Sequence, residues 1–239
     1  GGVATIVTQG NGTGDMIEFL GTLGYDGIWI EAEHGPIDFR DIPDLTRACD
    51  LWGLTSVVRI NLNLPGVIYR TLDVGAQAIV VPHVNTAEEA RMVVEGAKFY
   101  PLGQRGAYTS RQGIGVDGYQ EKANDETMAI ILIEDIVAVN NLSEILKVDG
   151  ISVFFVAPGD LAQSMGNPGK DKVQATVEAA IGQIASAGRG AGAVVNESNV
   201  ESYLNWGARF ILNSWAGWVS TGSKSYLEKV KSKNKYVNT

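Results

Sequence analysis

The stretch MAIILIE, residues 128–134, consists of six apolar residues followed by a single carboxylate, Glu134. A strand that is buried on both faces is apolar throughout, and such strands occur in parallel sheets covered by helices. Residues 78–81, AIVV, form a second run of this kind, and Pro82 and His83 follow it. Both runs predict a parallel sheet that is wrapped by helices.

The same unit, an apolar run followed by a helical stretch, recurs from one end of the chain to the other. Strands are predicted at residues 4–8, 27–31, 55–59, 78–82, 128–134, 151–156, 192–195 and 210–212. Helices, with apolar residues three and four apart, are predicted at 14–23, 41–52, 65–72, 86–99, 173–187 and 198–206. This alternation predicts an α/β fold, a closed (β/α)8 or TIM barrel, as a single domain over residues 1–239. A doubly wound open sheet is the alternative architecture.

Length and composition exclude several classes of protein. The chain has 239 residues, close to the ~250 typical of one barrel. The net charge is −8 and no long run of Lys and Arg occurs, which argues against nucleic-acid binding. No apolar run approaches the roughly 18 residues of a membrane span. The single cysteine, Cys49, permits no intrachain disulfide and fits a cytoplasmic protein, and we expect it to be a buried thiol in the helix at 41–52.

Polar residues interrupt the apolar strands mainly at their carboxyl ends, where parallel barrels carry their active sites. The chain has only two histidines, and both fall at this predicted rim. The residues at the strand ends are, in chain order, Glu31, Glu33, His34, Arg59, His83, Glu134 and Asp160.

Glu134 and Asp160 are the candidate metal ligands, because they follow neighbouring strands and could converge on one divalent ion. Hard cations prefer oxygen ligands, and Mg²⁺ often binds only one or two protein carboxylates. The alternative is that each is an N-cap or first-turn acid at the start of a helix.

His34 and Arg59 are the candidate catalytic groups. An imidazole beside Glu31 and Glu33 could be held in one tautomer for acid–base work, although His-Gly-Pro also forms an ordinary surface turn. An unpaired guanidinium at the end of an apolar strand is costly. Arg59 therefore either pairs with a buried carboxylate, such as Asp73 or Glu31, or receives an anionic substrate.

Two connections are longer than a barrel requires, at residues 100–126 and 157–171, and long connections of this kind are often lids or binding loops. The first contains GIGVDG, residues 113–118, which matches a nucleotide-binding GxGxxG pattern. No apolar strand precedes this segment and no amphipathic helix is predicted after it, so we expect a loop.

The rim residues and their neighbours resemble the HpcH/HpaI aldolase family, whose members include 4-hydroxy-2-oxoheptanedioate aldolase and 2-dehydro-3-deoxyglucarate aldolase. The similarity runs in order through residues 1–169. The matching segments are GYD at 24–26, EHGP at 33–36, VVR at 57–59, LDVGAQ at 72–77, VVPHV at 80–84, GQRG at 103–106, IE at 133–134 and PGDLA at 158–162.

This resemblance implies a class II, metal-dependent aldolase that binds Mg²⁺, Mn²⁺ or Co²⁺ through Glu134 and Asp160. The metal would chelate the carboxylate and keto oxygens of pyruvate or another 2-oxo acid, and Arg59 would stabilise the enolate. His34, with an acid such as Glu31 or Glu33, would activate a water that accepts the proton of the C4 hydroxyl. Asp73, which lies in a matching segment, completes the candidate catalytic set.

The resemblance also implies where the partners bind. The backbone at Ala157, Pro158 and Gly159 would seat the carboxylate of the 2-oxo acid, and an aldehyde would be the second small molecule. A homo-oligomer is implied, a hexamer by resemblance, with the C-terminal helical segment at a subunit interface.

Three features depart from the family pattern. Glu31 stands where Asp is common, Leu132 stands where many members have Gln, and the C-terminal third, with Trp215 and Trp218, matches poorly. We expect both tryptophans to be packing or interface residues. The alternative activities are oxaloacetate decarboxylation, a citrate-lyase-like CoA-thioester lyase, and a non-catalytic barrel that binds a 2-oxo acid. A Schiff-base aldolase is disfavoured because none of the ten lysines lies in an apolar strand.

Overall fold

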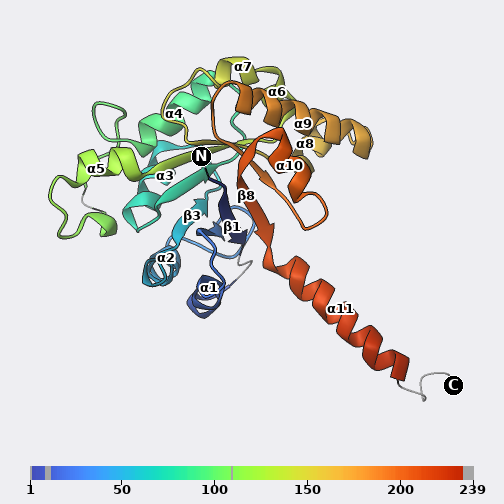
Figure 1. Ribbon diagram of the computed structural model, residues 1–239. Coiled ribbons are helices and arrows are strands. Elements are labelled where there is room, and N and C mark those ends of the chain that lie inside the picture. The colour runs from blue at the N-terminus through green and yellow to red at the C-terminus, as the bar shows by residue number, and fades with distance from the viewer. Residues whose placement is uncertain (1, 9–11, 109, 234–239) are drawn as a thin grey trace.

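The computed structural model describes residues 2–8, 12–108 and 110–233. Eight parallel strands close into a barrel in chain order, and the last strand pairs with the first. Figure 1 shows these strands at the centre, with helices around them. The predicted (β/α)8 barrel is confirmed, and the open-sheet alternative is excluded.

Most strand boundaries lie within one or two residues of those predicted from the apolar runs. The strands are β1 (Ala4–Thr8), β2 (Gly27–Glu31), β3 (Thr55–Arg59), β4 (Ala78–Val81), β5 (Met128–Ile133), β6 (Val153–Val156), β7 (Ala191–Val194) and β8 (Ala208–Ser214).

Helices follow the strands, and all but the last lie around the outside of the barrel. They are α1 (Gly14–Gly21), α2 (Ile42–Leu51), α3 (Pro65–Asp73), α4 (Ala87–Ala97), α5 (Tyr119–Glu126), α6 (Ile136–Asn140), α7 (Leu142–Ile145), α8 (Pro158–Ser164), α9 (Lys170–Ser186), α10 (Val200–Trp206) and α11 (Trp215–Lys233), with a 3₁₀ turn, η1 (Arg111–Gly113).

Two apolar cores hold this arrangement together. The larger lies between the strands and the surrounding helices, and it contains the predicted buried thiol of Cys49. The smaller fills the barrel interior, where Trp29 packs against Phe155 and Phe155 against Phe210, with ring centroids 5.3 and 6.2 Å apart. The barrel is therefore packed through its centre, so it has no open channel along its axis among the described residues.

Strand alternation decides which rim residues face the barrel axis. Successive side chains of a strand point to opposite faces, so residues two apart share a face. Trp29, Val57 and Leu132 belong to the interior core. Glu31, Arg59 and Glu134 lie two residues after them, so each continues an inward-facing row at the carboxyl end of its strand.

Residues 114–118 form turns, as the prediction of a loop requires, and a polar helix that the sequence did not reveal, α5, begins directly after Gly118. Its sequence, YQEKANDE, is polar and has no apolar period that would have revealed it. A side-chain contact attaches it instead, since the Asn124 amide bonds both the N–H and the carbonyl of Phe99, at 2.7 and 3.1 Å. The second long connection also contains a helix, α8.

The last helix, α11, extends away from the barrel, and none of its residues is buried (Figure 1). Its base is anchored where the Trp218 ring stacks on Tyr25, with ring centroids 6.1 Å apart. None of the described helices combines the length and the apolar content needed to cross a membrane.

Candidate active site

Arg59 is held at the rim by two carboxylates from strand β2 and the residues after it. Its Nε and Nη2 lie 2.7 and 2.6 Å from Glu31 Oε2, and its Nη1 lies 3.0 Å from Glu33 Oε2. Of the two carboxylates considered as partners for Arg59, Glu31 is the one that it contacts. The Trp29 indole N–H also donates to Glu31 Oε2, at 3.2 Å.

Glu31 shapes the loop that carries His34. Its other oxygen, Oε1, accepts the backbone N–H groups of Glu33 and His34, at 2.9 and 3.1 Å. Burial alone would raise the pKa of Glu31, but the bonds from Arg59 and these two N–H groups outweigh burial and lower it. Glu31 is therefore an ionised structural anchor, and its carboxylate has no oxygen left for the His34 imidazole.

Glu33 is the carboxylate that meets the imidazole. His34 Nε2 lies 3.6 Å from Glu33 Oε2, and the Glu33 side chain is only 8% exposed. This oxygen accepts no aligned hydrogen bond among the described residues, although Arg59 Nη1 is near it. Burial raises the pKa of Glu33, Arg59 and His34 oppose the rise, and Glu134 and Glu31 add to it.

Glu134 comes directly after strand β5, and its side chain is 3% exposed. The His83 backbone N–H donates to Glu134 Oε1 at 2.8 Å, and His83 Nδ1 lies 3.2 Å from the same oxygen. Burial raises the pKa of Glu134, the His83 N–H and imidazole oppose the rise, and the negative charge of Asp160 adds to it. Glu134 and Asp160 are thus close enough to repel each other.

The helix-cap alternative holds for Asp160 but not for Glu134. The cap of α6 is Asp135, whose Oδ1 accepts the Val137 N–H at 2.7 Å, so Glu134 has no capping role there. Asp160 is a first-turn acid of α8, as that alternative expected, and it is exposed. Within the part of the chain that the structure describes, no group of three or more His, Cys, Asp and Glu side chains is arranged as a metal cage.

Asp73 is not brought to this cluster. It is the last residue of α3, which runs back from the rim, and its Oδ1 lies 2.7 Å from Arg105 Nη2. The Arg105 guanidinium is buried and stacks over the Phe99 ring at 4.6 Å. This ion pair ties the loop after α4 to the end of α3, so the structure places Asp73 in a contact outside the rim cluster.

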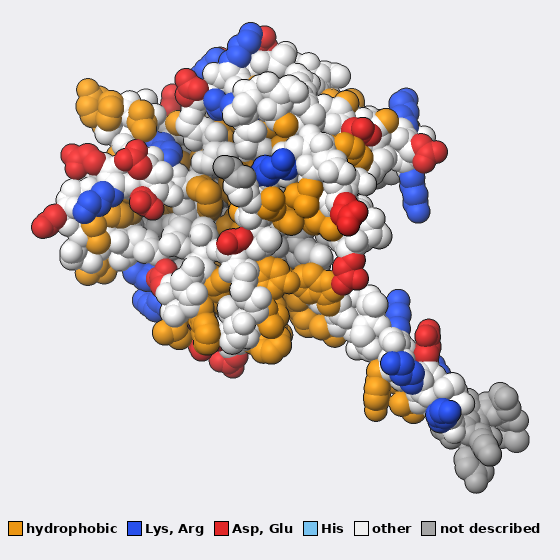
Figure 2. Space-filling model, in the orientation of Figure 1, with side chains coloured by type: hydrophobic (Ala, Val, Ile, Leu, Met, Phe, Trp, Pro, Cys, Tyr) orange, Lys and Arg blue, Asp and Glu red, His pale blue; other side chains and the backbone are white. Residues whose placement is uncertain are grey.

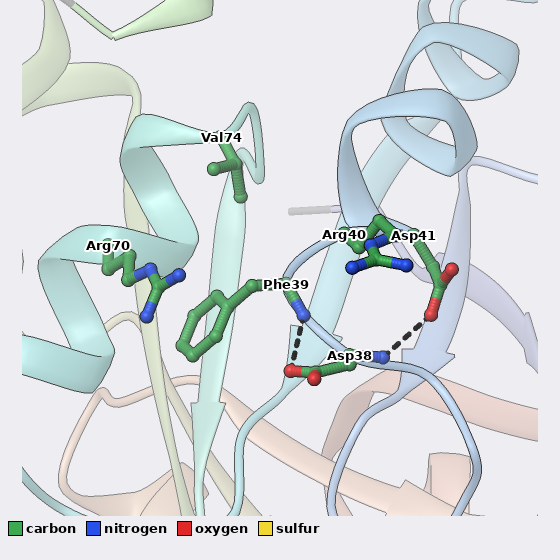
Figure 3. A pocket seen from close by; sticks show the side chains of 6 residues that line it. All are labelled: Asp38, Phe39, Arg40, Asp41, Arg70 and Val74. Carbon is green, nitrogen blue, oxygen red and sulfur yellow. Dashed lines mark hydrogen bonds between the residues drawn. The ribbon is translucent and has the colours of Figure 1, made fainter.

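A separate hollow of about 620 Å³ opens on the outside of the barrel, between α3 and the start of α2. In Figure 3 its bonds are local: the Asp38 N–H donates to Asp41, and the Phe39 N–H to Asp38. The Arg70 guanidinium stacks on the Phe39 ring at 4.1 Å. The lining residues are Asp38, Phe39, Arg40, Asp41, Arg70 and Val74, and none belongs to the rim cluster.

Sequence reasoning assigned no role to His83, although it placed both histidines at the rim. The available signal was position, because His83 follows Pro82 at the end of an apolar strand, as Glu134 follows β5. The contact with Glu134 could not be predicted, since it depends on a left-handed backbone conformation at His83, with φ of 55°.

Comparisons with known proteins find one matching family model and several similar chains. The family model for HpcH/HpaI aldolase/citrate lyase matches residues 10–218. A 2-keto-3-deoxy-L-rhamnonate aldolase of Salmonella gallinarum (strain 287/91 / NCTC 13346) is 36% identical over 208 residues, which cover 83% of this chain and 78% of that one. A crystal structure of an HpcH/HpaI aldolase/citrate lyase family protein from Burkholderia cenocepacia J2315 is 27% identical, with a TM-score of 0.87 and coverage of 96% and 95%. The citrate synthase SbnG is 26% identical, with a TM-score of 0.86 and coverage of 97% and 94%.

Proposed function

The chain belongs to the HpcH/HpaI aldolase/citrate lyase family and is a carbon–carbon lyase, and we propose that it acts at the barrel rim. There it cleaves 4-hydroxy-2-oxo acids into pyruvate and an aldehyde. The observation that carries the proposal is the arrangement of Arg59 and Glu134. Both continue inward-facing rows, and the Arg59 charge acts on the buried Glu134 carboxylate. A guanidinium and a carboxylate thus both face the barrel axis at the carboxyl end of the strands.

Glu134 and Asp160 are the residues that would hold a divalent cation, Mg²⁺, Mn²⁺ or Co²⁺. Among the described residues, only the His83 imidazole lies within ion-pairing distance of the buried Glu134 carboxylate. Two mutually repelling carboxylates, one of them buried, fit a hard cation that takes its other ligands from water and substrate. When bound, such an ion acts as a Lewis acid toward the oxygens of a 2-oxo acid.

Arg59 is placed to stabilise negative charge on the keto oxygen. Three of its nitrogens each meet a carboxylate oxygen of Glu31 or Glu33, which fixes the plane of the guanidinium. Because a guanidinium has five N–H donors, donors remain for a substrate oxygen. A donor that is fixed in advance at the place where an enolate develops lowers the barrier to carbon–carbon cleavage.

Glu33 and His34 together act as the general base in the proposed mechanism. They would orient a water that accepts the proton of the C4 hydroxyl, and the electron pair of the C3–C4 bond would pass to the enolate as the aldehyde forms. Glu33 Oε2, which accepts no aligned hydrogen bond among the described residues, and the exposed imidazole of His34, 3.6 Å away, support this role. The backbone at Ala157, Pro158 and Gly159, where α8 begins, would seat the substrate carboxylate.

The test is an aldol assay on the purified protein with Mn²⁺ or Mg²⁺. Pyruvate would be combined with a panel of aldehydes, and a 2-keto-3-deoxy acid would be supplied in the cleavage direction. We expect turnover that EDTA removes and added Mn²⁺ restores. Turnover that resists EDTA would contradict the metal-dependent mechanism.

Oxaloacetate and acyl-CoA substrates belong in the same panel, because a citrate synthase is among the structural relatives. Decarboxylation of oxaloacetate proceeds through the same enolate of pyruvate and needs no base at the C4 hydroxyl. If the protein decarboxylates oxaloacetate but cleaves no hydroxy acid, decarboxylase would replace aldolase as the function.

The helix α11 supports a homo-oligomer in which it packs on a second copy of the chain. It exposes four large apolar side chains, Val219, Tyr226, Leu227 and Val230. The barrel in turn exposes Phe19, Leu23, Leu51 and Trp52 on α1, α2 and the residues that follow them. Figure 2 shows apolar side chains gathered on this lower part of the barrel and again along α11.

Light scattering after gel filtration would test this assembly. We expect Leu227→Glu to lower the mass of the particle, whereas Lys224→Glu, a charge change on the same helix, should leave it unchanged. A wild-type protein that is monomeric at micromolar concentration would contradict the proposal.

A further inference from the structure

His83 contacts Glu134 through two groups that converge on one oxygen. Its backbone N–H and its Nδ1 lie 2.8 and 3.2 Å from Glu134 Oε1. The imidazole is 68% exposed while the carboxylate is 3% exposed, so His83 stands between Glu134 and solvent. Among the described residues, no donor is paired with the other oxygen, Oε2. Oε1 thus accepts one hydrogen bond and has the imidazole within ion-pairing distance, whereas Oε2 is available.

The backbone of His83 is held in a conformation that residues with a side chain rarely adopt. Its φ is 55°, in the left-handed region. The residues that follow enforce it. Val84 is fully buried, and Thr86 and Glu89 form a reciprocal capping box at the start of α4. The Asn85 carbonyl accepts a bond of 2.8 Å from the Asn141 side chain.

The strand below Glu134 offers no polar alternative. Leu132, two residues earlier on the same face, is an apolar member of the barrel core. It stands where the family resemblance led us to expect a glutamine in many members. In this chain the hydrogen bond to the Glu134 carboxylate and the nearby imidazole both come from His83 in the neighbouring β4–α4 connection.

We propose that His83 is a positioning residue, which orients Glu134 by contacting Oε1 through its backbone N–H and its imidazole and thereby presents Oε2 to the divalent cation. This inference rests on the proposed function, in which Glu134 is a metal ligand. Residues that hydrogen-bond a ligating carboxylate typically change metal affinity about 10–100-fold when they are mutated. The imidazole also reaches toward Glu33, with Nε2 3.9 Å from Glu33 Oε1.

Two substitutions distinguish the contribution of the His83 backbone N–H from that of its imidazole. His83→Gly tolerates positive φ and keeps the N–H donor, but it removes the side-chain donor. His83→Asn also tolerates positive φ, and its amide can donate to Oε1 in place of Nδ1. Asn167→Gly is the matched control, because Asn167 is the other described non-glycine residue with positive φ, at 53°, and it lies outside the rim cluster.

The readout is Mn²⁺ affinity, measured by electron paramagnetic resonance on the full-length protein without substrate, with circular dichroism to verify folding. We expect His83→Gly to weaken Mn²⁺ binding about 10–100-fold, and His83→Asn and Asn167→Gly to remain within about threefold of the wild type. If His83→Gly binds Mn²⁺ as the wild type does, while Glu134→Gln does not, the positioning role is wrong and the metal site stands.

Two other outcomes would also overturn the inference. A nitrogen coupling to Mn²⁺ in pulsed spectra that disappears in the His83 variants would make His83 a metal ligand and not a positioning residue. Mn²⁺ binding that survives in a Glu134→Gln, Asp160→Asn double variant would refute the proposed metal site, and the role of His83 with it.

Discussion

Arg59 donates to a single oxygen of Glu31 from two of its nitrogens, Nε at 2.7 Å and Nη2 at 2.6 Å. The two residues are in-register partners on β2 and β3, each the last residue of its strand. The pairing turns the remaining edge of the guanidinium toward Glu33, where Nη1 lies 3.0 Å from Oε2. The orientation of the proposed enolate-stabilising group is therefore set before substrate binds.

Arg59→Lys should lose nearly as much activity as Arg59→Ala. A lysine ammonium is a point charge without the planar fork, so it cannot meet Glu31 and Glu33 together and still face a substrate. We expect kcat/KM for aldol cleavage to fall roughly 100-fold or more in both variants, the size of an oxyanion-hole contact. Arg91→Ala, which breaks an exposed pair with Glu88, is the control. Substantial turnover in Arg59→Lys would show that charge alone suffices.

Glu33 and His34 should behave as one catalytic unit. Glu33→Gln and His34→Asn are each expected to lower kcat about 100-fold, within the range for a general base. The double variant should be little worse than either single variant, because groups that act together are not additive. Steady-state rates of the three variants test this. Effects that multiply would mean that the two residues serve separate steps.

The fold was predictable from the sequence because strands that are buried on both faces are apolar throughout, as residues 78–81 and 128–133 are. The rim positions followed, since Arg59 and Glu134 end such runs. The features that the sequence did not predict depend on single side-chain contacts. The Asn124 amide fixes α5 without any apolar period, and Arg105 draws Asp73 away from the rim. No local pattern encodes either contact.

The buried thiol of Cys49 should destabilise the protein at high pH. Burial raises the pKa of Cys49 from its ordinary 9.0 to about 12. Below pH 9 the thiol is protonated in both states and contributes no pH dependence. Above pH 9 only the unfolded state loses the proton, so stability falls as pH rises, by at most about 1.4 kcal/mol per pH unit.

Urea unfolding of the wild type and Cys49→Ala would isolate this contribution, since the other titrating groups are common to both proteins. At pH 7.5 the wild type should be the more stable, because alanine leaves a small void. By pH 10 that advantage should shrink by about 1.4 kcal/mol. A difference that stays constant between the two pH values would contradict the prediction.

The Glu134 carboxylate should lower the stability of the metal-free protein and raise the stability of the metal-bound protein. Its carboxylate is buried beside Asp160, and a buried charge without a cation is costly. Glu134→Gln removes that charge while its amide oxygen can still accept the His83 N–H. We therefore expect Glu134→Gln to raise the melting temperature measured in EDTA.

Added Mn²⁺ should reverse the order of the two proteins. A ligand that binds only the folded state stabilises it by RT ln(1 + [L]/Kd), about 2.7 kcal/mol at a hundredfold excess over Kd. The wild type should gain this stabilisation and Glu134→Gln should gain little, with Ca²⁺-free buffers and matched ionic strength in both series. A Glu134→Gln protein that is less stable than the wild type in EDTA would contradict the prediction. It would show that this carboxylate stabilises the fold, because only a structural role predicts a loss of stability when no metal is present.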